Sequence, residues 1–479
     1  MKKLKDPYLL RPDQTVTLHG ITFPLELLFR GALIVGQPGS GKTAGVLMPL
    51  LRSLLEATGI DSEEKTGMMV VDPKNELGSV VRKLLRELGR EDDLVVLSPG
   101  TSFYNPLDSA FLTENETIEK IIGFANNTNR NSAGRGREIE AYWENAQRNL
   151  LTAVVAATRK IKKRNISFAD INETFHKINK FQNMAAATAW CKETELDSRT
   201  IEGIRDFLNL PDSSTRPCVA TSVSGVLYFW QSEPLKTLVT PDQNLPAIDP
   251  FDILHRGKIL LVACSGPAFG VSISPLLVSI KEHLFSALLS RDQIEVREPD
   301  GKWTLINQKR PFFILADEFQ SYVTPSASTG ELVALDRLRG FRAGLIAATQ
   351  NLASLHSVLG DEAHATRLVA LFSNQVFLAN ICPYSVRQAS HILGQKTKRH
   401  VQREIGNRMA PPMLFRAKER KQMPAAMASS VTTSRVPRVD SATLAAMQTG
   451  EFYLRLADGT VHHKKAILSF ESPARESKS

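Results

Sequence analysis

Short apolar runs alternate with helix-like segments along much of the chain. Helical apolar spacing covers 44–55, 80–85 and 332–338, each after one of these runs. Runs without polar breaks are typical of strands buried on both faces of a parallel sheet. Strands of this kind are predicted at 32–35, 67–72, 94–97, 257–262, 311–319, 343–348 and 374–381, with polar residues only toward the ends of several of them. This alternation predicts an α/β fold with a mostly parallel sheet and helices on both faces.

The middle of the chain follows a different pattern. Between 118 and 229 the apolar spacing is helical, with a strong helix that opens at Tyr142 and ends in the basic run 159–164. Ser167 and Asp170 have the spacing of a capping box, which predicts the start of another helix. We therefore expect an all-α domain at 110–245, inserted between two parts of the sheet domain.

The length of 479 residues exceeds one ordinary core, so at least two domains are expected. The pattern gives a lead-in at 1–30 with an edge strand at 15–19, then a first part of the sheet domain at 31–109. A second part follows the all-α domain at 246–470. It closes with a hairpin, 452–456 and 461–470, around the turn Asp458-Gly459. The tail 471–479 is expected to be disordered.

The stretch 36–43, GQPGSGKT, fits the phosphate-binding pattern G-x-x-x-x-G-K-[ST]. It lies between a predicted strand and a predicted helix, which is the order that this motif requires. Lys42 is expected to reach the β- and γ-phosphates, and Thr43 to ligate Mg²⁺. The predicted nucleotide-binding residues are Gly36, Gly39, Ser40, Gly41, Lys42 and Thr43. The sequence therefore predicts a site for ATP and Mg²⁺.

A second motif closes the apolar run 311–319. Asp317 and Glu318 follow four apolar residues and an alanine, which is the pattern of a Walker B strand. We expect Asp317 to hold Mg²⁺ and Glu318 to orient and deprotonate the attacking water. The alternative is a surface Asp-Glu pair without a catalytic role.

Polar residues also follow two other predicted strands. Gln350 ends the run 343–348, and an amide there can contact both the γ-phosphate and the catalytic water; a turn-capping role is the alternative. Asp72 and Lys74 follow the run 67–72. Because ligands bind at the carboxyl ends of parallel strands, both are expected near the nucleotide or a subunit boundary. A salt-bridged structural role for Asp72 and Lys74 is equally open.

The composition, with 42% hydrophobic and 23% charged residues, is that of a soluble globular protein. The scattered cysteines Cys191, Cys218, Cys264 and Cys382 include no C-x-x-C pair, which argues against a zinc site or a disulfide framework. Glycines and prolines interrupt the uncharged stretch 259–280, so it is interpreted as a strand, a loop and a helix rather than a membrane span.

The net charge of +9 is compatible with an acidic partner such as nucleic acid. Much of the excess lies in the polar segment 395–422, which Pro411-Pro412 interrupts. This segment predicts either a binding region for a phosphate backbone or a flexible solvated loop. Its basic residues are Lys396, Lys398, Arg399, Arg403, Arg408, Arg416, Lys418, Arg420 and Lys421, against Glu404 and Glu419.

The order of these parts resembles the type IV secretion coupling proteins, the TraG/TraD-like DNA-transfer ATPases of bacterial conjugation. The resemblance extends from about 31 to 470. The two Walker motifs alone are generic, whereas the run Asp-Pro-Lys-x-Glu-Leu at 72–77 and the all-α insert are more specific. Further matching motifs are Phe103-Tyr104-Asn105-Pro106-Leu107, Tyr142-Trp143 and Thr349-Gln350.

The resemblance implies a RecA-like motor domain and a ring-shaped homohexamer that passes single-stranded DNA through its centre. It also implies a relaxase or relaxosome partner, and docking to a type IV secretion channel. Lys42, Thr43, Asp317, Glu318 and Gln350 match the nucleotide chemistry of the family. An arginine finger from the neighbouring subunit is expected too; Arg339 is the first choice, with Arg337 and Arg342 as rivals.

Members of that family usually begin with transmembrane helices, and here about thirty residues precede the first predicted strand of the sheet domain. The chain is therefore expected to be a membrane-free variety or a truncated one, held at the cytoplasmic face of the inner membrane by its partners. Two other functions stay open: an ATP-gated receptor that sorts protein substrates, and an FtsK/HerA-like motor on duplex DNA.

Overall fold

The computed structural model describes residues 14–59, 63–108, 117–118, 121, 137–163, 165–211, 215–264, 273–324, 330–360, 362–405 and 427–466. Its strands are β1 (Thr15–Leu18), β2 (Ile21–Pro24), β3 (Ala32–Val35), β4 (Gly67–Val71), β5 (Leu94–Leu97), β6 (Ile259–Val262), β7 (Glu295–Arg297), β8 (Trp303–Leu305), β9 (Phe312–Ala316), β10 (Ala343–Thr349), β11 (Asn374–Leu378), β12 (Gln395–Ile405), β13 (Met427–Pro437), β14 (Glu451–Arg455) and β15 (Val461–Lys465).

The helices fall into an amino-terminal pair, a central group and a carboxyl-terminal group. They are α1 (Met48–Glu56), α2 (Leu77–Glu87), α4 (Arg137–Lys162), α5 (Phe168–Asn179), α6 (Met184–Glu193), α7 (Ser198–Leu208), α8 (Thr215–Gln231), α9 (Leu235–Val239), α10 (Pro250–Arg256), α11 (Ser274–Leu289), α12 (Glu331–Leu338), α13 (Leu352–Leu359), α14 (Glu362–Leu371), α15 (Pro383–Leu393) and α16 (Ser441–Ala445). Short 3₁₀ turns are η1 (Leu25–Arg30), η3 (Glu91–Asp93), η6 (Phe319–Ser321) and η7 (Arg339–Phe341), and η2 (Thr43–Leu47) is a π-helical turn.

A nine-stranded sheet in the order β15-β14-β11-β3-β10-β9-β4-β6-β5 forms the centre of the fold. Its strands from β11 to β5 are parallel, and the antiparallel hairpin β14–β15 extends the β11 edge. All seven apolar runs thus form strands of one sheet, and the prediction of a mostly parallel α/β fold is confirmed. The order places β3 next to β10 and β10 next to β9, so the strands that precede the phosphate-binding loop, Gln350 and Asp317 are neighbours.

Alternate residues of the central strands enter two separate cores. Ala32 and Ile34 pack with α1, α2 and the amino-terminal hairpin β1–β2. Leu33 and Val35 point to the other face, which α11 to α15 cover. Both faces are therefore buried, which explains why the strands lack the polar alternation of a half-exposed sheet.

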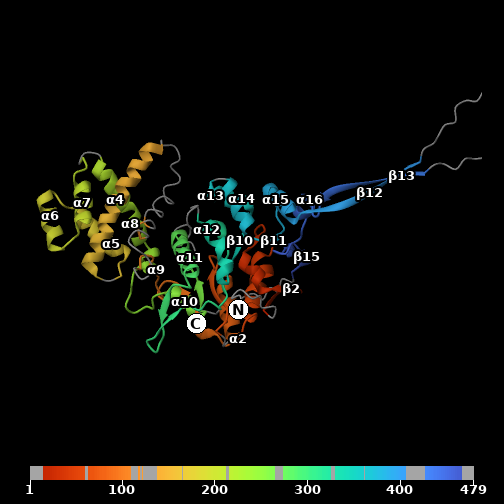
Figure 1. Ribbon diagram of the computed structural model, residues 1–479, viewed down its shortest axis with the longest axis horizontal. Helices are drawn as coiled ribbons and strands as arrows, with labels where there is room; N and C mark the ends of the chain where they lie inside the picture. Colours follow the sequence, from red (N-terminus) through yellow and green to blue (C-terminus); the bar gives the residue numbers. More distant parts are fainter. Residues whose placement is uncertain are drawn as a thin grey trace, which may run out of the picture.

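Between β5 and α10, the described elements are all helical. Figure 1 shows α4 to α8 gathered at one side of the sheet. The capping box is confirmed: Ser167 Oγ accepts a hydrogen bond from Asp170 N, and Asp170 Oδ2 accepts one from Ser167 N at 2.9 Å. Helix α4 begins at Arg137, five residues before the expected Tyr142. The stretch 126–136 before α4 lies outside the described residues.

The turn after the phosphate-binding loop is π-helical, and Pro49 accounts for part of this geometry. Proline has no N–H, so it cannot give Gly45 O the hydrogen bond that an α-helix would place there. Instead, His19 Nε2 approaches Gly45 O at 2.6 Å, and the contact requires the proton on Nε2. The turn between β1 and β2 is thereby fixed to the helix that follows the loop.

Three hairpins differ from the sequence predictions. The strand expected at the sheet edge over 15–19 pairs with β2 in a hairpin of its own. The basic segment from 395, expected to be either a phosphate-backbone contact or a flexible loop, begins as the strand β12, which pairs with β13 along eleven residues of each strand. The resulting two-stranded ribbon projects away from the helical side of the molecule (Figure 1). The hairpin β7–β8 was not predicted, because each strand has only three residues.

Candidate functional site

The phosphate-binding loop lies at the carboxyl ends of the central strands and is fixed by backbone hydrogen bonds on both sides. Gly36 N donates to Thr349 O at 3.2 Å, at the end of β10. Gln37 N donates to Ala379 O at 3.0 Å, just after β11, and Gly450 N donates to Ser40 O at 2.9 Å. The loop is therefore held in place by β10 and β11, the strands on either side of β3, and by the turn before β14.

Two of the glycines are required by the backbone of this loop. Gly39 and Gly41 have φ values of +74° and +95°, a region that other residues rarely adopt. Backbone amides in such a conformation can turn toward one anion, as phosphate loops need.

Lys42 is 6% exposed, and its Nζ donates to two carbonyls of its own loop, Gly36 O at 2.6 Å and Gln37 O at 3.1 Å. Burial lowers the pKa of Lys42, and the Glu318 and Asp317 carboxylates partly offset this effect. Among the described residues, Ser40 Oγ is buried without a hydrogen-bond partner. A buried cation and an unsatisfied hydroxyl beside a glycine turn fit a phosphate group.

Thr43 and Asp317 present oxygen atoms to each other across the loop. Thr43 Oγ1 donates to Asp317 Oδ2 at 3.4 Å, and Asp317 Oδ1 accepts from Glu318 N at 2.9 Å. Asp317 is 1% exposed, and burial raises its pKa. A hydroxyl and a carboxylate are the hard oxygen ligands that Mg²⁺ prefers, so this pair fits the predicted metal position.

Glu318 is held by three donors at once. Lys74 Nζ forms an ion pair with Glu318 Oε1. Glu318 Oε2 accepts hydrogen bonds from Gln320 Nε2 at 2.5 Å and from Gln350 Nε2 at 3.0 Å. Burial raises the pKa of Glu318, but the ion pair and the amide donors outweigh that effect and leave the pKa below its usual value. The backbone of Glu318 lies in the left-handed region at φ +49°, a strained conformation that is common at functional sites.

Gln350 therefore contacts the predicted base directly. Its own carbonyl accepts from Asn380 Nδ2 at 2.9 Å. The cap of the following helix α13 is instead Asn351, whose Oδ1 accepts from Ser354 N at 2.8 Å. The capping role that was the alternative for Gln350 is thus performed by Asn351.

Asp72 and Lys74 have separate roles in the turn after β4. Asp72 is fully buried, and its carboxylate accepts from Glu76 N at 3.0 Å and from Gly78 N at 2.7 Å, at the start of α2. Lys74 pairs with Glu318. Of the two open expectations, Asp72 has the structural role, while Lys74 lies beside the predicted catalytic base.

Arg339 is not part of this cluster. It is exposed in η7, before the amino end of β10, whereas the phosphate loop lies at the carboxyl ends of the strands. Arg337 is also exposed. Arg342 lies 5.6 Å from the centre of the Phe29 ring and donates to Gln14 Oε1 at 3.0 Å, so its side chain packs within its own subunit.

The sequence analysis missed a buried support behind the Walker B motif. Tyr322 Oη donates to Asp317 O at 2.8 Å, and Lys281 Nζ donates to Tyr322 O at 2.5 Å. Lys281 also forms an ion pair with Glu331. The one available signal was Lys281, next to Glu282 and His283, within the largely apolar stretch 274–289.

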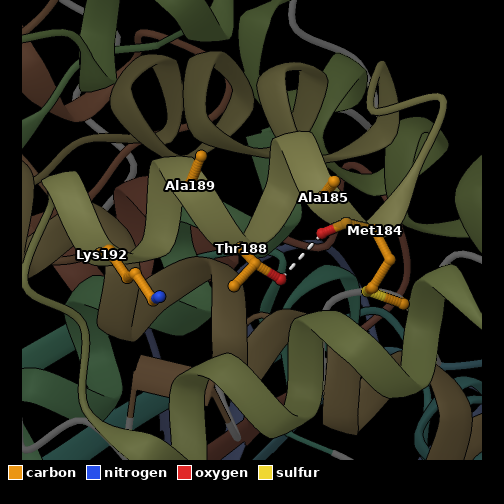
Figure 2. Close-up of a pocket in the computed structure, with 5 residues that line it drawn as sticks. All are labelled: Met184, Ala185, Thr188, Ala189 and Lys192. Atoms are coloured by element: carbon orange, nitrogen blue, oxygen red, sulfur yellow. Dashed lines mark hydrogen bonds between the residues drawn. The ribbon is translucent and has the colours of Figure 1, made fainter.

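A hollow of about 500 Å³ lies along α6, away from the residues above in the sequence, and Figure 2 draws the residues that line it. Thr188 Oγ1 already donates to Met184 O at 2.8 Å, and Lys192 is the one charged group of the lining. The lining residues, Met184, Ala185, Thr188, Ala189 and Lys192, therefore offer little chemistry.

Residues 11–244 match the family model described as "Type IV secretory system Conjugative DNA transfer". The match includes the phosphate-binding loop and the helices up to α9, and it confirms the resemblance inferred from the motifs.

Solved structures of the bacterial conjugative coupling protein TrwB share the fold of nearly the whole chain. An unbound form matches with a TM-score of 0.63 at 16% identity and covers 96% of this chain and 90% of that one. A complex of TrwB with ADP and Mg²⁺ matches with a TM-score of 0.60 at 18% identity and covers 97% and 91%. The expected RecA-like fold is thus confirmed.

A human protein described as "Probable ATP-dependent RNA helicase DDX28" is 36% identical over 86 residues. That alignment spans 17% of this chain and only 16% of the helicase. Across the described part of the chain, every helix is too short or too polar to cross a bilayer.

Proposed function

We propose that this protein is an ATP-driven motor that delivers DNA to a type IV secretion channel during conjugation. The observation that carries the proposal is the hydrogen-bonded set of Glu318, Gln350 and Lys74 beside Lys42 and the Thr43–Asp317 pair. The family match at 11–244 and the TrwB-like fold support the same reading. TrwB structures with ADP and Mg²⁺ support ATP and Mg²⁺ as the ligands.

In this proposal each side chain has one task. Lys42 and the loop amides neutralise phosphate oxygens, while Thr43 and Asp317 hold Mg²⁺, which withdraws charge from the phosphates when bound. Glu318 takes the proton from the water that attacks the γ-phosphorus, and the bond from that phosphorus to the bridging oxygen of ADP breaks. Gln350 holds that water in line. Positioning and charge stabilisation supply most of the rate.

The proposed assembly is a homohexameric ring, as the resemblance to the coupling proteins implies. In that ring, Arg339 of one subunit contacts the nucleotide bound to its neighbour, with Arg337 as the rival. Arg339 is exposed and lies away from its own phosphate loop, so it is available to a neighbour.

We further propose the division into a motor domain at 31–109 and 246–470 and an all-α domain at 110–245. Single-stranded DNA with a bound relaxase is the proposed substrate. The chain works at the cytoplasmic face of the inner membrane and reaches it through channel partners.

The ribbon β12–β13 is proposed as one DNA contact. Near its base, Lys396, Lys398 and Arg399 on β12 and Arg435 on β13 are exposed. Backbone pairing sets Lys398 opposite Ser434 and Arg399 opposite Thr433, so each of these cations has a hydroxyl residue across the ribbon. This combination suits phosphate oxygens, and it gives the basic segment a defined geometry.

The test is the ATPase rate of the full chain with single-stranded DNA, duplex DNA or no DNA at low salt, with Lys42→Ala as the blank. Stimulation by single-stranded DNA that weakens as salt rises is the expected result. A rate indifferent to DNA would favour the protein-sorting receptor, and stimulation by duplex alone would favour an FtsK/HerA-like motor. No hydrolysis above the Lys42→Ala blank would overturn the proposal.

A further inference from the structure

We infer that Lys74 is a switch residue that holds the base Glu318 while nucleotide is absent and transfers to the terminal phosphate when a triphosphate binds. The inference rests on the proposed function, because it assumes that ATP occupies the loop. It assigns to Lys74 the discrimination between ATP and ADP.

The first argument is the state of Glu318. Oε1 is paired with Lys74, and Oε2 accepts hydrogen bonds from Gln320 and Gln350. A carboxylate that a cation and two amide donors already stabilise takes a proton from water less readily. Departure of the Lys74 cation therefore makes Glu318 a stronger base.

The second argument is that Lys74 is the donor free to move. Its side chain is 43% exposed, against 10% for that of Glu318. Gln320 is also held from the other side, because its Oε1 accepts from Thr349 Oγ1 at 2.9 Å. Lys74 has a flexible stem and a charge that an arriving anion attracts.

The third argument is that the backbone turn that carries Lys74 is fixed. In the register of the sheet, Val71 lies opposite Ala316, so Asp72 and Asp317 follow at the same level. Asp72 anchors the turn through Glu76 N and Gly78 N. Lys74 therefore starts from a rigid turn beside Asp317, within reach of the place where Lys42 and the loop amides would hold phosphates.

The charges around Lys74 make the exchange favourable. Glu318, Asp317 and Glu76 attract its ammonium group, and Lys42 lies close enough to act on the same carboxylates. A triphosphate with Mg²⁺ adds negative charge at the γ-position that a diphosphate lacks. When Lys74 moves to that charge, Glu318 loses its cation and one oxygen becomes available for water.

The test measures Kd by calorimetry on the full chain with Mg²⁺ and either a non-hydrolysable ATP analogue or ADP. Lys74→Met keeps the stem and removes the charge. We expect it to weaken binding of the analogue about tenfold, the size of one charge-assisted hydrogen bond, and to leave ADP binding unchanged. Arg82→Met, an exposed position on α2, is the matched control and should alter neither Kd.

Glu318→Gln completes a double-mutant cycle. Removing the carboxylate charge frees Lys74, so this variant should bind the analogue more tightly than the wild type, and the gain should vanish when Lys74→Met is added. Equal weakening of ADP and analogue by Lys74→Met, no change in either, or an additive cycle would overturn the inference. Failure of the wild type to bind either nucleotide would instead refute the proposed function, and retained ADP binding shows that each variant is folded.

Discussion

Lys281 and Glu331 form an ion pair whose side chains are 1% and 0% exposed. It joins α11 to the first turn of α12, directly behind the Walker B motif. Lys281 also donates to Tyr322 O, and Thr324 N donates to Glu331 Oε2 at 3.0 Å. The pair thus fixes the two ends of the segment between η6 and α12.

Removing only one partner of this ion pair should destabilise the protein strongly. Lys281→Met leaves the Glu331 carboxylate buried without its cation, so we expect a loss of about 3–5 kcal/mol in the free energy of unfolding. Adding Glu331→Leu should recover most of that loss. Urea denaturation of both variants gives the measurement, and equal destabilisation by the single and double variants would contradict the expectation.

The amide of Gln350 should matter to the chemical step more than to binding. Gln350→Ala removes a donor from Glu318 and from the water that we place there, and we expect kcat to fall about 10²-fold with little change in ADP affinity. Gln293→Ala, an exposed glutamine after α11, serves as the control. An unchanged kcat would remove Gln350 from the proposed mechanism.

The arginine finger can be tested by mixing inactive variants. Arg339→Ala should lower kcat about 10³-fold in a uniform ring. Mixed with Lys42→Ala subunits, it should regain part of the activity, because some intact phosphate loops then face an intact Arg339. If mixing restores nothing, while Arg337→Ala lowers kcat and is rescued by the same mixing, the finger is Arg337.

Charge reversal on the ribbon tests the DNA contact. Lys396→Glu with Lys398→Glu should reduce stimulation by single-stranded DNA and lower the salt slope of binding by about 0.7 for each lost phosphate contact. Basal ATPase should persist. Lys192→Glu with Lys236→Glu, at exposed positions on α6 and α9, is a control of equal charge change, and an equal loss in that control would mean that net charge, rather than the ribbon, attracts DNA.

The contributions of His19 and Pro49 to stability can be tested in a double-mutant cycle. His19→Ala leaves Gly45 O without the imidazole donor, so we expect a loss of about 1–3 kcal/mol in stability. Pro49→Ala restores a backbone N–H at that position, so His19→Ala should cost less in that background. Additive losses in thermal unfolding would show that the His19 contact and the missing N–H of Pro49 are independent.

Much of the motor domain could be predicted from the sequence because its signals are local. The loop 36–43 and the strand ending at Asp317 each contain their pattern within a few consecutive residues. The run 343–348 before Gln350 is a local signal of the same kind, and it forms β10. The position of β10 beside β9 depends on strand order, which the connection rules for parallel strands limit to a few arrangements.

Other features depend on contacts between distant segments. Lys74 and Glu318 are far apart in the sequence and come together because β4 pairs with β9 in the sheet. No local pattern indicates that their side chains meet. The strand β12 was missed because its polar, basic composition resembles that of a loop. Its partner β13 also begins more than twenty residues further along the sequence. Local propensity for a strand is weak evidence when pairing supplies the backbone hydrogen bonds.

The attachment of the ribbon makes it a lever. Its base is fixed to α15, because Arg438 N donates to Gly394 O at 2.8 Å and Ser390 Oγ donates to Val439 O at 2.6 Å. Beyond α16, Gly450 N holds Ser40 O of the phosphate-binding loop. A strand of eleven residues is about 35 Å long, so a small force at the tip produces a large torque at this base. If the ribbon binds DNA as proposed, tension on that DNA would act through this base on Ser40 of the phosphate-binding loop.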